Sequence, residues 1–397
     1  MSNEIKMNII NALAESLDVP DSAYEAAVNR YHDLGGWLMD ASKAKTAQYS
    51  PDVFPQGSFR LGTVTRPWKR EDYDLDLACT LKAGVTKTNC SQEVLKQLLG
   101  TDLNAYREER HISESLEEKH RCWRLYYQDH LQFHMDSTPS IPQSADTRRV
   151  LQERMIKAGS TEALALDVAN LAIAITDDRH PKYREISGDW LISNPKGYAK
   201  WFESRMRQAK QFLESRAIME KVAKVDDLPT YKWKTPLQRC VQILKRHRDV
   251  MFERSPDRKP ISVIITTLAA RAYQGESDIQ TAMETILNRM DSFVNPTYPR
   301  IPNPVNPHED FADRWGTEEG RKLGLEQNFG RWLEQARSDF DIIVSSQDRD
   351  SIADQAMLKY GARLEDKTLA KIVGAAPAVI TAPKSHHITD AAKPWRR

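Results

Sequence analysis

Two aspartates on one short apolar segment limit the folds and chemistries open to this chain. In Tyr73-Asp74-Leu75-Asp76-Leu77-Ala78 apolar and acidic residues alternate, which predicts a strand over 73–80 with one buried face and both carboxylates on the other. Neighbouring carboxylates repel each other, and a divalent cation relieves that repulsion. Hard oxygen ligands suit Mg²⁺ better than zinc. The alternation therefore predicts a magnesium site on a sheet.

A second segment repeats the same pattern further along the chain. The stretch 125–136 reads as strand, and within 131–136 the side chains of Gln132, His134 and Asp136 fall on one face. If this strand lies beside the first, Asp136 completes a cluster of three carboxylates. Such a cluster can hold two Mg²⁺ ions about 4 Å apart, the arrangement used for in-line phosphoryl and nucleotidyl transfer.

The pair Gly57-Ser58 precedes the first strand and supplies a phosphate-binding turn. A glycine permits close approach of the backbone, and N–H groups at a helix start form an anion site. The Ser58 hydroxyl can add one hydrogen bond to a phosphate oxygen. The chain has neither a GxxxxGK[ST] nor a GxGxxG pattern, which excludes Walker-type and Rossmann sites.

Composition excludes several other classes of protein. Lys and Arg total 57 against 56 Asp and Glu, so the net charge of +1 gives no large field to attract nucleic acid or an anionic membrane. With 40% hydrophobic and 28% charged residues, the chain is expected to be folded. No apolar run approaches 18 residues and no signal peptide opens the chain, so we expect no membrane association and a cytoplasmic location. The four cysteines form no CxxC pair, which argues against disulfides and structural zinc.

Periodicity divides the chain into a mixed half and a helical half. Residues 5–17 read as a helix that ends before Pro20, and a second helix is expected from Ser22, with Glu25 completing a capping box and a break near Gly35-Gly36. Helix is also predicted over 147–174, a loop over 177–195, and helices alone over 197–333, one of them starting at Pro236. The expected division is a mixed α/β domain at 1–180 and a helical domain at 181–373. A mobile tail is expected at 374–397.

The order of these segments resembles the polymerase-β-like nucleotidyltransferase superfamily. More closely, it resembles the bacterial cGAS/DncV-like nucleotidyltransferases (CD-NTases) of CBASS anti-phage defence. The segments that carry the resemblance are QGSFRLGT (56–63), YDLDLAC (73–79), HMDSTPSIP (134–142), LQRCVQILKRHRD (237–249), KPISVIITTLAARAY (259–273) and NPVNPHEDFADRW (303–315). The resemblance implies an α+β, bilobed fold with a central cleft. One lobe would be a polymerase-β-like core and the other a helical domain similar to that of oligoadenylate synthetase.

The resemblance also implies roles for particular residues. Asp74, Asp76 and Asp136 would be the catalytic and metal-binding residues, with Asp136 helping to activate the attacking sugar hydroxyl. The nucleotide-binding residues would be Gln56, Gly57, Ser58, Lys245 and Ser262, all directed at the donor phosphates. Either Arg121 or Arg124 would hold the acceptor nucleotide.

The residues themselves leave alternatives open for two of these positions. Lys245 stands at the polar end of the helix that starts at Pro236, where a solvated lysine is the ordinary interpretation. Ser262 follows Pro260 at an expected helix start, where a capping role is ordinary.

Together the resemblance and the residues predict a Mg²⁺-dependent nucleotidyltransferase, with two ions per site and Mn²⁺ as a substitute. It would join ATP, GTP or pyrimidine NTPs into a cyclic di- or trinucleotide with release of pyrophosphate. The product would activate an effector, and regulatory proteins are further expected partners. The Cys- and His-rich insert of the animal enzyme is absent, which argues against activation by DNA, and the tail ends in Trp-Arg-Arg without a terminal Gly or Ala for conjugation. The alternatives are an enzyme that makes linear products or modifies an RNA or small-molecule acceptor, and a non-catalytic nucleotide-binding regulator.

Overall fold

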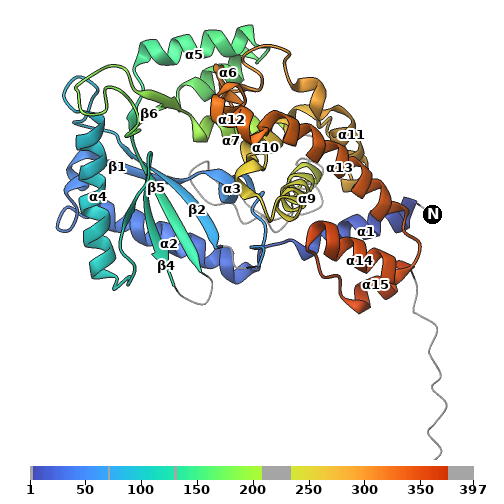
Figure 1. Cartoon of the computed structure of the whole chain (residues 1–397). Coiled ribbons are helices and arrows are strands. Elements are labelled where there is room, and N and C mark those ends of the chain that lie inside the picture. Colours follow the sequence, from blue (N-terminus) through green and yellow to red (C-terminus); the bar gives the residue numbers. More distant parts are fainter. Residues whose placement is uncertain (1–2, 70–71, 129–131, 208–233, 374–397) are drawn as a thin grey trace, which may run out of the picture.

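The computed structural model describes residues 3–69, 72–128, 132–207 and 234–373. The fold is α+β and has two lobes, one built on a sheet and the other on helices (Figure 1). The α+β fold class predicted from the sequence is confirmed.

The sheet of the first lobe is mixed, in the order β1-β2-β5-β4-β3. Its strands are β1 (Pro51–Pro55), β2 (Tyr73–Leu81), β3 (Glu117–Glu118), β4 (Trp123–Tyr127) and β5 (Phe133–Pro142), and β6 (Ile173–Ile175) and β7 (Leu191–Ser193) continue from the far end of β5. Strands β2 and β5 run parallel in a register that sets Asp76 opposite Asp136, whereas β4 runs antiparallel to β5.

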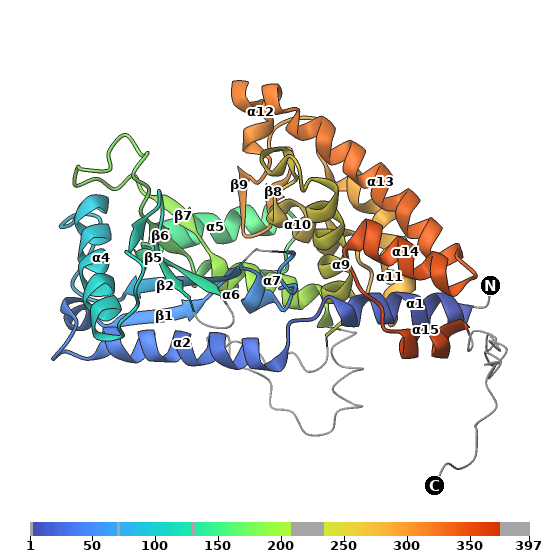
Figure 2. The ribbon, with the colours of Figure 1, turned by 60° about the horizontal axis from the view of Figure 1, so that its bottom comes forward.

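Alternation along β2 orients the sheet as the sequence predicts. Tyr73, Leu75 and Leu77 are buried in the core of this lobe, which α2 (Asp21–Met39) and α4 (Gln92–Glu109) share. Helix α2 runs along β1 and β2 on this side (Figure 2). The aspartates of β2 therefore point away from the core, and α3 (Gly57–Leu61) begins beside them. Helices α5 (Ala145–Lys157) and α6 (Glu162–Ala169) follow β5 and bury Met155, Ala165 and Val168 in the core of the helical lobe.

The second lobe is built around α9 (Pro236–Met251). Thr235 and Gln238 form a reciprocal capping box and Pro236 is the first helical residue, so the predicted helix start is confirmed. The other elements of the lobe are α1 (Asn3–Ser16), α7 (Pro195–Arg205), α10 (Ser262–Ala272), α11 (Ile279–Arg289), β8 (Pro302–Asn303), β9 (Asn306–Asp310), α12 (Glu318–Leu323), α13 (Leu325–Ser345), α14 (Arg349–Tyr360) and α15 (Asp366–Val373). Short 3₁₀ turns lie at Lys45–Tyr49, Pro256–Arg258, Met290–Phe293 and Asp313–Gly316.

Several predicted elements have different bounds. Helix α2 starts at Asp21 with Pro20 as its N-cap, so the capping box expected at Ser22 is wrong. The helix also runs unbroken through Gly35 and Gly36. A Cβ at Gly36 would meet no atom within 4 Å, whereas Gly35 is buried beside β1. Packing on the sheet thus outweighs the low helix propensity of glycine.

Short strands account for the other differences. The stretch predicted as one strand over 125–136 contains the antiparallel pair β4 and β5, and the region predicted as one helix over 147–174 holds α5, α6 and β6. Strand β7 lies in the expected loop, and the β8–β9 hairpin interrupts the expected run of helices. Two- and three-residue strands have no periodicity of their own, because sheet neighbours stabilise them. The predicted tail lies outside the described residues.

Helix α1 packs away from the sheet. Its Ile9, Ile10 and Leu13 belong to the core of the helical lobe, together with residues of α9 and α13. The chain therefore starts in one lobe, builds the other, and returns. The domain division near residue 180 stays a prediction. Within the described residues, no helix combines the length and apolar character needed to cross a membrane.

Candidate active site

The three predicted aspartates meet at the face of the sheet that points toward the helical lobe. Ligand oxygens of Asp74, Asp76 and Asp136 all lie within 4.8 Å of one another. The parallel register of β2 and β5 produces this arrangement, because Asp76 and Asp136 are direct partners and Asp74 lies two residues before Asp76. The sequence pattern predicted this cluster on the condition that the two strands lie side by side, and they do.

Electrostatics at the cluster favour a bound cation. Burial raises the pKa of Asp76 well above its ordinary value, and the negative charges of Asp74 and Asp136 raise it further. The side chain of Asp74 is half exposed. Three converging carboxylates, one buried and one open to solvent, form the hard-oxygen donor set that Mg²⁺ and Mn²⁺ prefer, so the residues present fit a divalent ion.

Two basic side chains hold the cluster in place. Arg124 on β4 donates from Nε and Nη2 to both oxygens of Asp136, at 2.6 and 2.8 Å. His134 Nε2 lies 3.0 Å from Asp74 Oδ1. Arg124 is one of the two arginines predicted to hold the acceptor nucleotide. In this structure it orients the third aspartate, and its role toward the acceptor nucleotide stays a prediction.

Gly57 is positioned directly against the cluster. Its φ of +63° lies in the left-handed region, and a Cβ there would come within 2.1 Å of Asp76 Oδ2. Both the positive φ and the close approach to Asp76 therefore require glycine at this position. The backbone of α3 starts beside the carboxylates, where phosphate groups would bind next to the metals.

Asp74 and Asp76 line the wall of a cleft of about 750 Å³ between the lobes, and Asp136 lies beside them. Gln56, Gly57 and Ser58 line it from the sheet side, and Lys245 and Ser262 line it from the helical lobe. Gln56 Nε2 donates to the Leu77 carbonyl oxygen at 3.3 Å. All the predicted nucleotide-binding residues thus surround one space, and their roles stay predictions.

Lys245 is buried, not solvated. It is 8% exposed and its Nζ donates to the Thr63 carbonyl oxygen at 3.1 Å. Burial and the nearby charge of Arg248 lower the pKa of Lys245 to about 8, although Asp249 and Asp76 oppose the shift. The alternative of a solvated helix-end lysine is wrong, and the cation faces the cleft from α9.

Ser262 begins α10, but it is not the cap. Ile261 is the N-cap, and Ser262 Oγ accepts a hydrogen bond from Arg248 at 3.0 Å. Asp249 accepts two bonds from Arg248 and one from Lys259. A network of charged groups thus lines the cleft where α9 and α10 meet.

The β8–β9 hairpin adds two cleft residues to which sequence reasoning gave no role. Asn303 Nδ2 donates to Glu309 Oε2 at 2.7 Å, and both residues line the cleft. Burial raises the pKa of Glu309, while the Asn303 hydrogen bond and the charge of Arg121 lower it in part. The family-like stretch 303–315 was the only signal for these positions.

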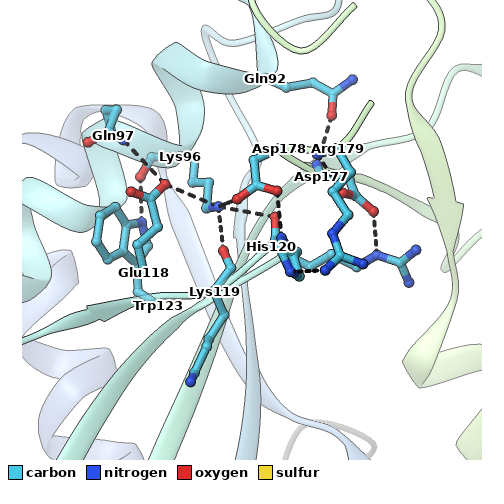
Figure 3. A network of polar contacts seen from close by, with 11 residues as sticks. Gln92, Lys96, Gln97, Glu118, Lys119, His120, Trp123, Asp177, Asp178 and Arg179 are labelled. Carbon is cyan, nitrogen blue, oxygen red and sulfur yellow. Dashed lines mark hydrogen bonds and ion pairs between the residues drawn. The ribbon is translucent and has the colours of Figure 1, made fainter. Parts of the chain in front are cut away.

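Arg121, the other candidate for the acceptor nucleotide, pairs with Asp177, which belongs to a network of polar contacts (Figure 3). Its Nε donates to Asp177 Oδ2 at 2.7 Å, and the Asp177 N–H donates to Gln92. Lys96, fully buried, binds the carbonyl oxygens of residues 119 and 120 and pairs with Asp178. Asp177 thus holds Arg121 where its charge lowers the pKa of Glu309 on the other lobe.

Fold and site together define a nucleotidyltransferase of the polymerase-β type: paired strands carry three aspartates beside a Gly-Ser turn, and a helical lobe closes the cleft. The family model for the nucleotidyltransferase domain of cyclic GMP-AMP synthase DncV-like proteins matches residues 51–139. A c-di-GMP synthase of Roseivirga ehrenbergii is 30% identical over 308 residues, which cover 76% of this chain and 71% of that protein.

Two further relatives agree. The cyclic dinucleotide synthase CdnG of Bradyrhizobium diazoefficiens is 25% identical over 329 residues, covering 77% of this chain and 69% of CdnG. Its structure in complex with GTP superposes with a TM-score of 0.61, covering 93% of this chain and 98% of that one, at 19% identity. The complex of Escherichia coli CdnC with HORMA-deltaN gives a TM-score of 0.56 at 13% identity, covering 92% and 100%.

The chain therefore belongs to the cGAS/DncV-like nucleotidyltransferases, as its sequence motifs predicted. It is a nucleotidyltransferase, and enzymes of this family use divalent metal ions.

Proposed function

We propose that this enzyme converts GTP into a cyclic dinucleotide signal with release of pyrophosphate. The observation that carries the proposal is the three-carboxylate cluster beside Gly57 on the wall of a two-lobed cleft. The relatives support the product, since one is named a c-di-GMP synthase and another a cyclic dinucleotide synthase. A cytoplasmic role in anti-phage signalling is part of the same proposal, as is an effector that responds to the product.

Asp74, Asp76 and Asp136 would hold two Mg²⁺ ions, with Mn²⁺ as a substitute. When bound, the ions lower the pKa of the attacking hydroxyl and neutralise the triphosphate and its leaving group. Asp136 would help to orient that hydroxyl, its own position fixed by Arg124. Gln56, Gly57 and Ser58 would bind the donor phosphates from the sheet lobe, and Lys245 and Ser262 from the helical lobe.

Substitution of Asp76 tests the proposed metal site. Asp76→Asn removes the buried carboxylate at the centre of the cluster, and we expect pyrophosphate release from GTP to fall by about 10²-fold or more with the fold retained. Chelation of divalent ions should abolish release by the wild-type enzyme. Asp72→Asn, in the same cleft but outside the cluster, is the matched control and should retain activity. Near-normal release by Asp76→Asn, in a folded protein, would reject the assignment.

Glu309 supports guanine as the base. Its carboxylate lines the cleft and is held by an amide group, Asn303 Nδ2. A carboxylate accepts hydrogen bonds only. The guanine edge offers two adjacent donors, N1–H and the 2-amino group, whereas adenine places the N1 acceptor beside its amino group. An ionised Glu309 would thus attract guanine and repel the acceptor on adenine.

Glu309→Gln tests this assignment. The amide offers a donor to adenine N1 and loses the charge, so the preference for GTP over ATP, measured as the ratio of kcat/KM values, should fall at least tenfold. Inosine triphosphate, which lacks the 2-amino group, should be used less well than GTP by the wild-type enzyme alone. An unchanged ratio would place base recognition elsewhere.

A regulatory protein partner is the last part of the proposal. The solved complex of CdnC with HORMA-deltaN shows that a structural neighbour assembles with a second protein. For this chain, such a partner would have to bind outside the cleft in order to leave the nucleotide site open.

A further inference from the structure

A second cavity, of about 920 Å³, lies in the helical lobe. It is bounded by the turn that ends α5, by α7, by the C-terminal end of α10 and by the prolines around β8. Among the described residues, Asn303 alone lines both this cavity and the active-site cleft. In this part of the chain the cavity is therefore a separate hollow that meets the cleft at β8.

Positive charge gathers in this cavity without a negative partner. Arg205, Arg207 and Arg271 line it, and among the residues that the structure describes no Asp or Glu does so. Arg205 donates to the carbonyl oxygens of Ala270 and Tyr273, at 2.9 and 3.1 Å. Arg271 donates to the Pro302 carbonyl oxygen at 2.6 Å. Burial lowers the pKa of Arg271, and the charge of Arg205 adds to this effect against an opposing influence of Tyr198.

Several other buried or half-buried arginines differ in this respect, because they pair with carboxylates: Arg60 with Glu203, Arg124 with Asp136, Arg248 with Asp249 and Arg300 with Glu326. Within the described residues no carboxylate pairs with Arg205 or Arg271 to offset their mutual repulsion. An anion between them would relieve it.

Helix capping explains only part of the cluster. Arg205 binds the last carbonyl groups of α10, a favourable place for a cation. That role uses two of its five N–H donors, and Arg271 uses one. Arg207 is exposed and has no hydrogen bond or ion pair in the described part of the chain. Most of the guanidinium donors are thus free to bind a ligand.

We propose that this cavity binds a phosphate-bearing small molecule. Guanidinium groups recognise phosphate through paired N–H donors. The Ser160 hydroxyl lies in the same wall, and Phe293 and Pro304 give the cavity an apolar side for the body of a ligand. A volume of about 920 Å³ lies within the range that accommodates a nucleotide. The ligand is either a free phosphate anion or a nucleotide, which share this chemistry.

A ligand bound in this cavity would affect the active-site cleft through a few contacts. Arg271 holds the Pro302 carbonyl oxygen, and the next residue, Asn303, holds Glu309 in the cleft wall. A ligand that drew Arg271 toward itself would weaken the first of these contacts.

Isothermal titration of the full-length protein with pyrophosphate, at low salt and with EDTA, tests the proposal. Without divalent ions the three active-site carboxylates repel anions, whereas the arginine cavity needs no metal. We expect one pyrophosphate per chain, with affinity at least threefold weaker in Arg207→Gln and tenfold weaker in Arg207→Gln/Arg271→Gln. Arg207 is exposed and has no hydrogen bond or ion pair with another described residue, so Arg207→Gln separates binding from folding.

Two control variants complete the design. Arg184→Gln removes an exposed arginine remote from the cavity, and Lys245→Gln removes the cation of the active-site cleft. Both should bind pyrophosphate as the wild-type protein does. Tighter binding of ADP than of pyrophosphate would identify a nucleotide as the ligand, and equal binding a free phosphate. The proposal is overturned if the wild-type protein binds neither, if binding survives in the double variant, or if it is lost in Lys245→Gln.

Discussion

At the scale of single residues, Gly57 shows how closely the backbone and the carboxylate cluster are fitted together. No other residue type can hold φ at +63° while leaving Asp76 Oδ2 in place, since an added Cβ would come within 2.1 Å of that oxygen. The Gly57-Ser58 turn and the carboxylate cluster are therefore in direct contact and not only near each other in sequence.

Comparison of Gly57→Ala with Gly159→Ala should separate the effect of a Cβ against Asp76 from the effect of a positive φ on stability. We expect a loss of about 1–3 kcal/mol in the free energy of unfolding and a fall of about 10²-fold in GTP turnover, because Asp76 must move. Gly159→Ala is the matched control: its φ is +92°, but a Cβ there meets nothing within 4 Å. It should lose stability alone. Normal turnover by Gly57→Ala would show that Asp76 can move without consequence.

At the scale of elements, α9 joins the two lobes through polar side chains. Gln238, Gln242 and Lys245 donate to the carbonyl oxygens of Leu61, Val64 and Thr63, respectively. These contacts hold the end of α3 and the segment that follows it, and so position the Gly57-Ser58 turn against the helical lobe. At the end of α1, Asp18 accepts from Arg239 and Lys234 and fastens that helix to the start of α9.

The stabilising effect of the contact between Asp18 and the start of α9 depends on pH. Burial raises the pKa of Asp18, but the charges of Arg239 and Lys234 outweigh it and hold the pKa below its ordinary value. A carboxyl group whose pKa is lower in the folded than in the unfolded protein stabilises the fold. This stabilisation is complete at a pH above the pKa of the unfolded chain, near 4, and is lost as the pH falls through the pKa of the folded protein. Asp18→Asn should therefore cost on the order of 1–2 kcal/mol at pH 7 and progressively less below about pH 4.

Urea unfolding between pH 3.5 and 7 measures this difference. Asp167→Asn, which removes the partner of Lys200 from an exposed pair, serves as the control and should change stability little at any pH. A difference between wild type and Asp18→Asn that stays constant down to pH 3.5 would contradict the assignment.

At the scale of the whole molecule, the sequence predicts what is local and repeated. The alternation in β2 identified the face that carries the aspartates, because Tyr73, Leu75 and Leu77 each indicate that the opposite face is buried. The pairing of Asp76 with Asp136 required the resemblance to a family, since register between distant strands has no local signal. Lys245 seemed solvated because α9 has many polar residues, yet its polar face is buried against the other lobe. The β8–β9 hairpin was missed because β8 has two residues and β9, Asn-Pro-His-Glu-Asp, has no alternation of apolar and polar residues.

The central claim is that one cleft joins and then cyclises nucleotides. The most direct test incubates the full-length protein with GTP and Mg²⁺, treats the products with phosphatase, and identifies what survives by mass spectrometry. Asp74→Asn/Asp76→Asn is run in parallel. The account predicts a phosphatase-resistant cyclic dinucleotide from the wild-type enzyme and none from the variant. Only linear, phosphatase-sensitive products from the wild-type enzyme, or equal product from both proteins, would contradict it.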